Sequence, residues 1–301
     1  MIVRLACEEM IELGFGPYSA RVAPAAGGRI AALAWRDGGA SVPLLVEWDG
    51  QAFDEHAWPK AGAFPMLPFA NRLPRDGFVF RGTLVRPEPG PAGFALHGSA
   101  HRRAWSVVES TSQRAVMRCT HDGGDAAWPW PWVAEQVVEL GQRGMTVTLS
   151  IKNEATEPMP LAMGWHPYHP ADPDMAGGGL GFSAHARHEL DEDGRACDQV
   201  EMPLFTMQPG ETAAFSEWTG SACLRSPARG SIVVSCTGVS GLVLHRPVRG
   251  SYFCAEPVTL LPGRLGEKSE SDGSGVLPAR QVRQFTWTCG FAPASAQDTG
   301  M

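Results

Sequence analysis

Four segments of the 301-residue chain place polar or ionisable side chains inside apolar, proline-rich stretches. In chain order they contain Asn71 and Arg72, then His97, then His166 and Tyr168, and finally Glu256. A buried arginine needs an acceptor, because a buried charge is normally paired whatever its role. Asp76 or backbone carbonyls could serve Arg72, and each of the other groups could be a satisfied core side chain. Histidine and glutamate are also residue types that transfer protons near neutral pH.

Several common catalytic and metal-binding patterns are missing from the sequence. It has no G-x-x-x-x-G-K-[ST] phosphate loop, no G-x-G-x-x-G turn and no G-x-S-x-G nucleophile elbow, so kinase, dinucleotide-dependent and α/β-hydrolase functions lose their main support. The close histidine pairs are His97/His101, His166/His169 and His185/His188. Such pairs converge on a metal when a helix presents them, but the first two lie in segments typical of loops. We expect no metal site, and we expect surface or capping roles for His101, His121, His185 and His188.

The elements that must position these residues read as short strands. Residues 145–152 alternate between apolar and polar, which predicts a half-buried antiparallel strand. Residues 133–140 join it through a hairpin loop at 141–144. Similar runs occur at 30–35, 78–80, 105–109, 115–120, 231–236, 242–245 and 284–289. Short strands without helical periodicity between them predict an all-β sandwich or barrel.

The chain shows no linker and no repeat, so we expect a single domain over residues 1–301. Glycine (35 residues) and proline (25 residues) are frequent, which leaves little room for long helices. We place the core at about 13–290 and expect loosely held ends at 1–12 and 291–301.

Composition limits the partners of the protein. The chain carries 25 Lys+Arg against 32 Asp+Glu, a net charge of −7, which disfavours nucleic acid and anionic membranes. No apolar run reaches the roughly 18 residues of a spanning helix. Glu8, Glu9 and Glu12 stand where a secretory apolar region would be, so we expect a cytoplasmic protein. Seven cysteines without a C-x-x-C pair are typical of reduced, mostly buried thiols.

Four motifs, taken together and in order, resemble the aldose 1-epimerase (galactose mutarotase) family. They are Asn71-Arg72, His97-Gly98, Gly164-Trp165-His166-Pro167-Tyr168 and Glu256-Pro257-Val258-Thr259. The resemblance extends over residues 28–289, nearly the whole chain. It implies a large antiparallel β-sandwich, the galactose mutarotase-like supersandwich, with a sugar-binding cleft across one sheet.

The resemblance also implies a reaction, the interconversion of the α and β anomers of a free aldose by ring opening and reclosure. His166 matches the general acid and Glu256 the general base, and as imidazolium and carboxylate they are the natural pair near neutral pH. The residues that match substrate-binding positions are Asn71, Arg72, His97 and Tyr168. One acid and one base suffice for this chemistry, so the resemblance implies no metal and no cofactor.

Aromatic and acidic residues give two further expectations about the cleft. An indole face can pack on a pyranose, and the candidates are Trp58, Trp165 and Trp218. Members of the family usually carry an acidic residue just before an aromatic in the segment where this chain has Ala213-Ala214-Phe215. We therefore expect one acceptor for a sugar hydroxyl to be missing, unless Glu211 or Glu217 replaces it.

Two other functions stay open. A non-catalytic carbohydrate-binding or sensing protein would keep the fold, although it has no evident need for both His166 and Glu256. An epimerase for a phosphorylated or otherwise anionic sugar would draw on Arg72, Arg75 or Arg246, unless these are solvated or paired. In each case the expected partner is a small-molecule sugar, and the expected assembly is a monomer or a homodimer.

Overall fold

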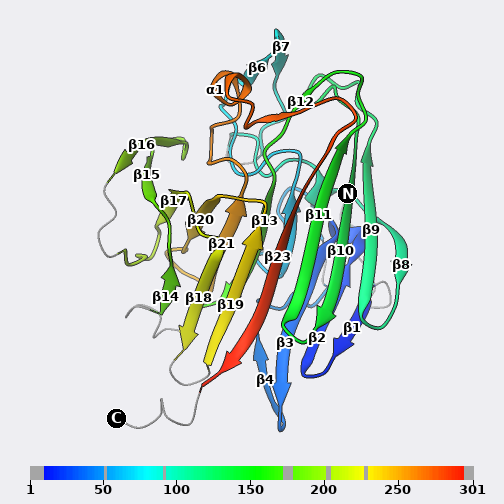
Figure 1. The fold of residues 1–301 in the computed structure, drawn as a ribbon, viewed down its shortest axis with the longest axis vertical. Coiled ribbons are helices and arrows are strands. Elements are labelled where there is room, and N and C mark those ends of the chain that lie inside the picture. The colour runs from blue at the N-terminus through cyan, green and yellow to red at the C-terminus, as the bar shows by residue number, and fades with distance from the viewer. Residues whose placement is uncertain are drawn as a thin grey trace.

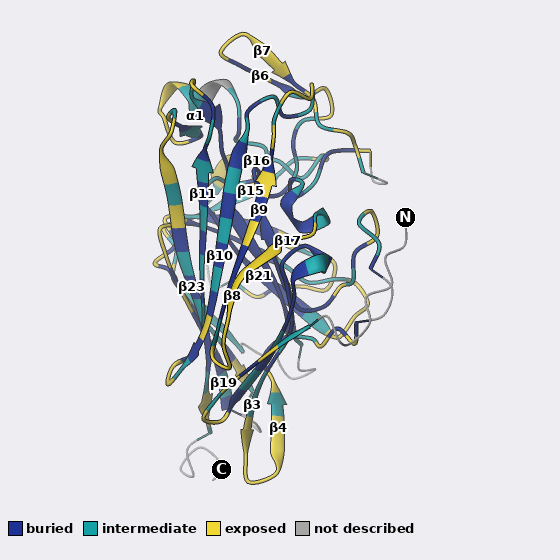
Figure 2. Ribbon diagram, turned by 90° about the vertical axis from the view of Figure 1, so that its right-hand side faces the viewer, coloured by how far each residue is buried: buried dark blue, intermediate teal, exposed yellow. Residues whose placement is uncertain are grey.

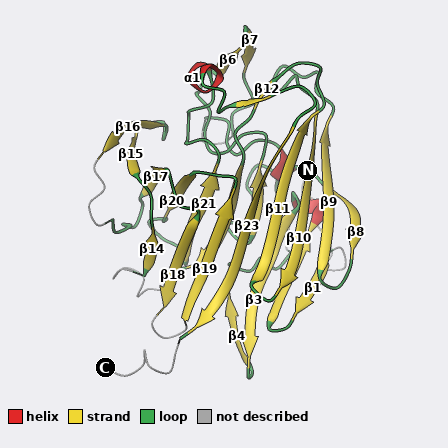
Figure 3. Ribbon diagram, in the orientation of Figure 1, coloured by secondary structure: helices red, strands yellow, loops and turns green. Residues whose placement is uncertain are grey.

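The computed structural model describes residues 10–50, 53–90, 93–171, 179–200, 205–226 and 230–294. Most of the regular structure is antiparallel β-strand (Figure 3), which confirms the predicted all-β class. Helix is limited, in these ranges, to α1 (Glu267–Ser271) and two single 3₁₀ turns. No helix in the described ranges has the length and apolar character needed to cross a membrane.

The larger of two main sheets combines strands from both halves of the chain. Its strands are β1 (Ile11–Phe15), β2 (Tyr18–Ala23), β3 (Arg29–Asp37), β4 (Ala40–Pro43), β5 (Ala63–Met66), β13 (Gly164–Pro170), β15 (Ala186–Leu190), β16 (Ala196–Val200), β17 (Thr212–Ser216), β20 (Gly241–His245) and β21 (Tyr252–Val258). Their order is β1-β2-β3-β5-β13-β21-β20-β17-β15-β16, with β4 beside β3. This order puts β5, β13 and β21 side by side, although they are far apart in the sequence.

The second sheet has eight strands and more regular pairing. Its strands are β8 (Ser106–Ser110), β9 (Arg114–His121), β10 (Trp132–Gly141), β11 (Gly144–Asn153), β14 (Leu180–Phe182), β18 (Ser221–Ser226), β19 (Gly230–Thr237) and β23 (Val282–Pro293), in the order β14-β18-β19-β23-β11-β10-β9-β8. Two small two-stranded sheets complete the fold, the hairpin of β6 (Phe78–Phe80) with β7 (Thr83–Val85) and the long-range pair of β12 (Met159–Pro160) with β22 (Val276–Leu277). The predicted hairpin at 133–152 is confirmed as β10 and β11.

The two main sheets pack face to face (Figures 1 and 2). The core between them takes Leu149 from β11, Trp287 from β23 and Trp165 from β13. The opposite face of the larger sheet carries a second apolar cluster that includes Phe64 and Tyr168. Because successive residues of a strand point to opposite faces, β13 contributes to both clusters. The larger sheet is thus covered on both sides, whereas β8 is exposed along its length at the edge of the smaller sheet (Figure 2).

One sequence-based expectation, about a loop, is wrong. The segment His166–Pro170, expected to be a loop, lies in β13, where its prolines are tolerated beside an irregular ladder. Near the ends of the chain, Ile11 of β1 pairs with Val22 and Phe291 of β23 pairs with Ile232. Residues 1–9 and 295–301 lie outside the described residues. The six described cysteines are free and four are buried, as expected, and Cys7 is outside the described ranges.

Candidate active site

A cavity of about 220 Å³ lies on the outer face of the larger sheet, the face turned away from the smaller sheet. It is called the cleft below. All six residues selected from the sequence line it, namely Asn71, Arg72, His97, His166, Tyr168 and Glu256. Strand β13 supplies His166 and Tyr168, and β21 supplies Glu256. The other three residues lie in loops. The fold therefore brings four distant motifs to one place.

His166 and Glu256 face each other from neighbouring strands. The antiparallel register, which pairs Tyr168 with Cys254, puts His166 opposite Glu256. Nε2 of His166 lies 3.4 Å from Oε1 of Glu256. The two residues are only 6% and 3% exposed. An acid and a base at this separation need only a small approach to exchange a proton.

The imidazole of His166 is positioned by aromatic neighbours, but its hydrogen-bonding capacity is only partly used. Its ring stacks against Phe64 (centroids 4.7 Å apart) and against Tyr168 (4.6 Å). Nδ1 of His166 and Oε2 of Glu256 have no hydrogen-bond partner among the described residues. Buried polar atoms are normally satisfied, so the pair keeps unused hydrogen-bonding capacity in the lining of the cleft.

Burial shifts the ionisation of this pair. It lowers the pKa of His166 well below its ordinary value, and the nearby His97 and Lys60 lower it further. Burial raises the pKa of Glu256 to about 8, against the opposing effect of the Asn71 side chain. Near neutral pH the free cleft therefore holds its proton on Glu256 and keeps His166 neutral. This is the reverse of the imidazolium and carboxylate expected from the sequence.

Two residues with left-handed backbone fix the side chain of His97. Asn71 has φ 57° and His97 has φ 62°. The backbone N–H of His97 donates to the Asn71 carbonyl (3.0 Å), and the N–H of Asn71 donates to Nδ1 of His97 (3.3 Å). Because Nδ1 accepts, the neutral imidazole carries its proton on Nε2, which becomes a donor. The loop passes so close to Leu67 that a Cβ at Gly98 would lie 1.9 Å from the Leu67 carbonyl oxygen.

Two basic side chains line the cleft. Arg72 donates through NH1 to the backbone carbonyl of Asp193 (3.0 Å), so a carbonyl and not Asp76 is its acceptor. Lys60, which sequence reasoning missed, places its ammonium 4.4 Å from the ring centroid of Trp58. An exposed lysine in a proline-rich segment carries no pattern that would have selected it.

Of the three tryptophans expected at the cleft, only Trp58 lines it. Its Nε1 donates to the Tyr168 hydroxyl (3.3 Å). Trp165 is fully buried and packs against Trp287 (centroids 5.8 Å apart), because alternate residues of β13 point into the core between the sheets. Trp218 belongs to the same core. The expectation is therefore wrong for Trp165 and Trp218.

His101 and His121 are buried, which corrects the expected surface or capping roles. His101 is fully buried, and its Nδ1 donates to the His97 carbonyl (3.2 Å), so it supports the loop that carries His97. His121 is 6% exposed and belongs to a neighbouring cavity. His185 is exposed and His188 is half-buried.

The position expected to lack an acid has apolar surroundings. Ala214 pairs with Val243, and Val243 pairs with Glu256, so Ala214 lies in the same cross-strand row as the acid and base. Ala214 is fully buried. The pair of Thr212 and His245 lies two positions further along the same strands, and both residues line the cleft. Oγ1 of Thr212 lies 2.9 Å from Nδ1 of His245.

Neither Glu211 nor Glu217 lines the cleft. Oε1 of Glu211 accepts from Arg187 (2.9 Å), and Oε2 accepts from the backbone N–H of Gln208 (2.8 Å). Glu217 is exposed and follows the other end of β17. The hydroxyl and imidazole of the neighbouring row are thus the polar groups on this side of the cleft.

His166, Cys254 and Glu256 each offer a metal-ligating atom, and these atoms lie within 4.8 Å of one another. Residue spacing did not reveal this group, because it forms across two strands. Burial and the Glu256 carboxyl raise the pKa of the Cys254 thiol well above its ordinary value, so the sulfur keeps its proton and is a poor ligand. These electrostatics favour proton transfer over metal binding.

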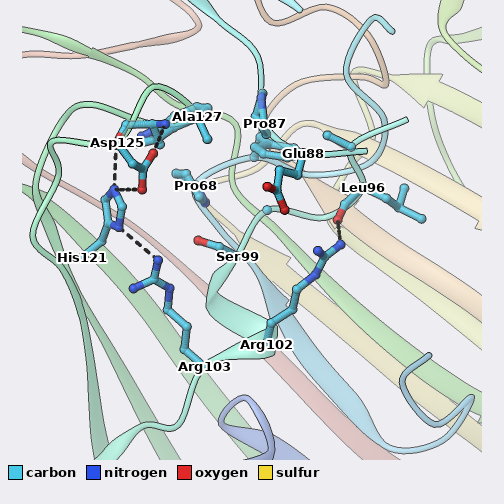
Figure 4. Close-up of a pocket in the computed structure, with 14 residues that line it drawn as sticks. Pro68, Pro87, Glu88, Leu96, Ser99, Arg102, Arg103, His121, Asp125 and Ala127 are labelled. Carbon is cyan, nitrogen blue, oxygen red and sulfur yellow. Dashed lines mark hydrogen bonds and ion pairs between the residues drawn. The ribbon is translucent and has the colours of Figure 1, made fainter. Parts of the chain in front are cut away.

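A larger cavity, of about 330 Å³, lies next to the cleft, and Figure 4 shows the residues that line it. Leu96 lines both cavities. In the larger one Nε2 of His121 donates to the Trp128 carbonyl (2.7 Å), and Nδ1 accepts from Arg103 (3.1 Å). Nε2 also lies 3.8 Å from Oδ2 of Asp125, so both ring nitrogens of His121 are engaged within this network.

Comparison with known proteins points to one family. A family model described as aldose 1-epimerase matches residues 9–260. The uncharacterized protein YphB of Escherichia coli K12 is 27% identical over 247 residues, which cover 76% of this chain and 81% of that protein.

Solved structures share the fold at low sequence identity. A protein of Escherichia coli K12 superposes with a TM-score of 0.78 at 21% identity, covering 94% of this chain and 99% of its own. A galactose mutarotase-like protein from Lactobacillus casei gives 0.77 at 17% identity (94% and 100% covered). The galactose 1-epimerase of Lactobacillus acidophilus gives 0.73 at 12% identity (98% and 99% covered). The galactose mutarotase-like sandwich is therefore confirmed as the fold.

Proposed function

This chain belongs to the aldose 1-epimerase family, and we propose that it interconverts the α and β anomers of a free aldose. The observation that carries the proposal is the buried pair of His166 and Glu256, 3.4 Å apart, in the lining of the cleft. Ring opening removes a proton from the anomeric hydroxyl and delivers one to the ring oxygen, so it needs one base and one acid.

Glu256 is the proposed base and His166 the proposed acid. Transfer of the Glu256 proton across the 3.4 Å contact gives the carboxylate and imidazolium forms without changing the number of protons. A hydrogen bond from a sugar hydroxyl to Glu256 stabilises its carboxylate. The carboxylate then accepts the anomeric proton while the imidazolium protonates the ring oxygen, and the ring opens to the aldehyde. After C1 turns, the reverse transfers close the ring on its other face.

The other cleft residues hold the sugar and orient the pair. Arg72 and Nε2 of His97 are the proposed donors to sugar oxygens, which gain negative charge as the ring opens. Asn71 acts through His97, whose tautomer its backbone N–H fixes. Tyr168 acts through His166, against which it stacks. Each of these groups is anchored before the sugar arrives, so little reorganisation is needed during the reaction.

Magnetisation-exchange NMR of anomer interconversion tests the proposal. Neutral, deoxy and anionic aldoses are compared with buffer alone, and Glu256→Gln is the matched control for the intact protein. We expect an interconversion rate above that of buffer that rises linearly with protein concentration for at least one aldose. Sugar binding without any acceleration would overturn the proposal and favour a carbohydrate-binding protein.

A further inference from the structure

The charged groups that line the cleft do not balance. Two basic residues, Lys60 and Arg72, line it against a single acidic one, Glu256. The acid is buried against His166, and its raised pKa keeps it largely protonated in the free cleft. Among the described lining residues, the positive charge therefore has no fixed negative counterpart.

Lys60 is anchored but not neutralised. The ion pairs formed between described residues do not include Lys60, whose ammonium lies over the ring of Trp58. Trp58 is in turn held by its hydrogen bond to Tyr168 on the cleft floor. A cation held over an aromatic face keeps its attraction for an anion, because the ring supplies no net charge. The positive charge acts well into the cleft, since after burial itself it is a leading cause of the lowered pKa of His245.

The acidic residues around the rim are engaged elsewhere. Asp193 accepts from Nε of Arg75 (2.8 Å), and Glu211 accepts from Arg187 (2.9 Å). On the wall formed by β17 and β20 the cleft presents neutral groups, the hydroxyl of Thr212 and the imidazole of His245. The nearby carboxylates thus already have partners and do not offset Lys60.

We propose that the cleft is built for an aldose that carries an anionic substituent, a carboxylate or a phosphate, with the Lys60 ammonium as its counterion. This inference rests on the proposed function and names its substrate class. A neutral hexose would leave the Lys60 charge unused, whereas an anionic one forms a charge-assisted hydrogen bond with it. Arg75 and Arg246, the other arginines considered for such a group, are bound to Asp193 and to the Met207 carbonyl.

Matched sugars test this inference. Exchange NMR gives kcat/KM for glucose and galactose, for the corresponding uronic acids and for the corresponding 6-phosphates, each with wild type and Lys60→Gln. The two anionic series separate a carboxylate from a phosphate as the group recognised. We expect one anionic series to exceed its neutral parent, and Lys60→Gln to lower kcat/KM for that series about 10- to 100-fold, with a much smaller loss on the neutral sugars.

Lys152→Gln is the matched control, because Lys152 pairs with Glu154 (2.7 Å) and does not line the cleft. Faster turnover of neutral sugars than of both anionic series, or an equal loss on all sugars in Lys60→Gln, would overturn the inference and leave the proposed function standing. If no sugar is interconverted, the proposed function fails, and equilibrium binding of the same sugars decides the role of Lys60. Tighter binding of an anionic sugar that is lost in Lys60→Gln would support it, and equal binding would overturn it.

Discussion

Leu96 lines two neighbouring cavities, and the histidines of these cavities differ in their hydrogen bonding. In the larger cavity Arg103 bonds to one ring nitrogen of His121 (Figure 4), and the Trp128 carbonyl bonds to the other. In the smaller one, a nitrogen of His166 and an oxygen of Glu256 have no partner among the described residues. The histidine of the larger cavity thus belongs to a hydrogen-bonded network, whereas the pair in the smaller cavity keeps unused hydrogen-bonding capacity.

Unpaired buried atoms do not identify a site by themselves, because Trp128 Nε1 and Gln136 Oε1 are also unpaired within the described ranges and their residues do not line the cleft. What distinguishes the cleft is an acid and a base that face each other there. Leaving a buried acceptor or donor unpaired costs about 1–3 kcal/mol, and a polar ligand that bonds to the His166–Glu256 pair would offset this cost. Burial also moves the pKa of Glu256 to about 8, close to the range in which a general acid or base works best. The comparison predicts different consequences for equivalent substitutions in the two cavities.

The largest expected effect is on turnover. His166→Asn and Glu256→Gln should each lower kcat for anomer interconversion by roughly 10²- to 10⁴-fold, because each removes one partner of the proton transfer. Both variants should stay folded, because each replacement is polar and of similar size. Exchange NMR gives kcat, and the thermal unfolding midpoint reports the fold.

His121→Asn is the matched substitution in the larger cavity. It should leave kcat unchanged while lowering the free energy of unfolding by about 1–3 kcal/mol, since the Trp128 carbonyl and Arg103 lose a partner. A large loss of turnover in folded His121→Asn, or near-wild-type turnover in either cleft variant, would break the contrast between the cavities.

The next effect concerns stability and pH. Burial raises the pKa of Glu256 from 4.5 to about 8 in the folded protein, so the folded state holds this proton more tightly than the unfolded chain. The resulting stabilisation is complete below about pH 4.5 and is lost as the pH rises toward 8. Glu256→Gln has no such proton, so its stability relative to wild type should increase across that window. Chemical denaturation at several pH values measures the difference, and a constant difference would show that Glu256 titrates normally.

Much of the fold could be predicted where one face of a strand is buried and the other is exposed. Strand β11 alternates between buried and half-buried residues, so 145–152 was recognised as a strand, and the structure extends it to Gly144–Asn153. Strand β13 has no alternation, because the core covers one face and the cleft covers the other, and it contains Pro167. A segment buried on both faces and interrupted by proline resembles a loop in the sequence.

The sequence motifs predict the central residues of the candidate site but not the other polar residues that line the cleft. The six selected residues stand out as polar groups among apolar neighbours, and the structure gathers them in one cleft. Lys60, Thr212 and His245 do not stand out, because polar residues at strand ends and in loops are common. Their place in the cleft depends on cross-strand pairing, such as that of Thr212 with His245, which no local pattern fixes.

A smaller effect is expected on substrate discrimination. The row that contains Ala214 offers no acid, so the Thr212 hydroxyl is the polar group available on this wall. We expect weak discrimination between galactose and its singly deoxygenated analogues. Thr212→Val should change the remaining ratio of their kcat/KM values by about tenfold. Glu211→Gln is the control and should change nothing, because its carboxylate already binds Arg187. Strong discrimination that disappears in Glu211→Gln would show that the acceptor lies there instead.

Exhaustive chelation is expected to change neither turnover nor the melting temperature, which makes it the smallest effect in this series. The ligating atoms of His166, Cys254 and Glu256 are close enough to raise the question of a metal. A metal there would have to displace the proton of a thiol whose pKa burial and the neighbouring carboxyl raise, and it would enter a cleft that already contains Lys60 and Arg72. Each of these conditions weakens cation binding. Cys254→Ser removes the softest ligand and should likewise retain turnover. The opposite result would be activity that is lost on chelation, restored by one metal and absent from Cys254→Ser. It would show that His166 and Glu256 act as ligands of a metal centre and would remove the contrast between the two cavities.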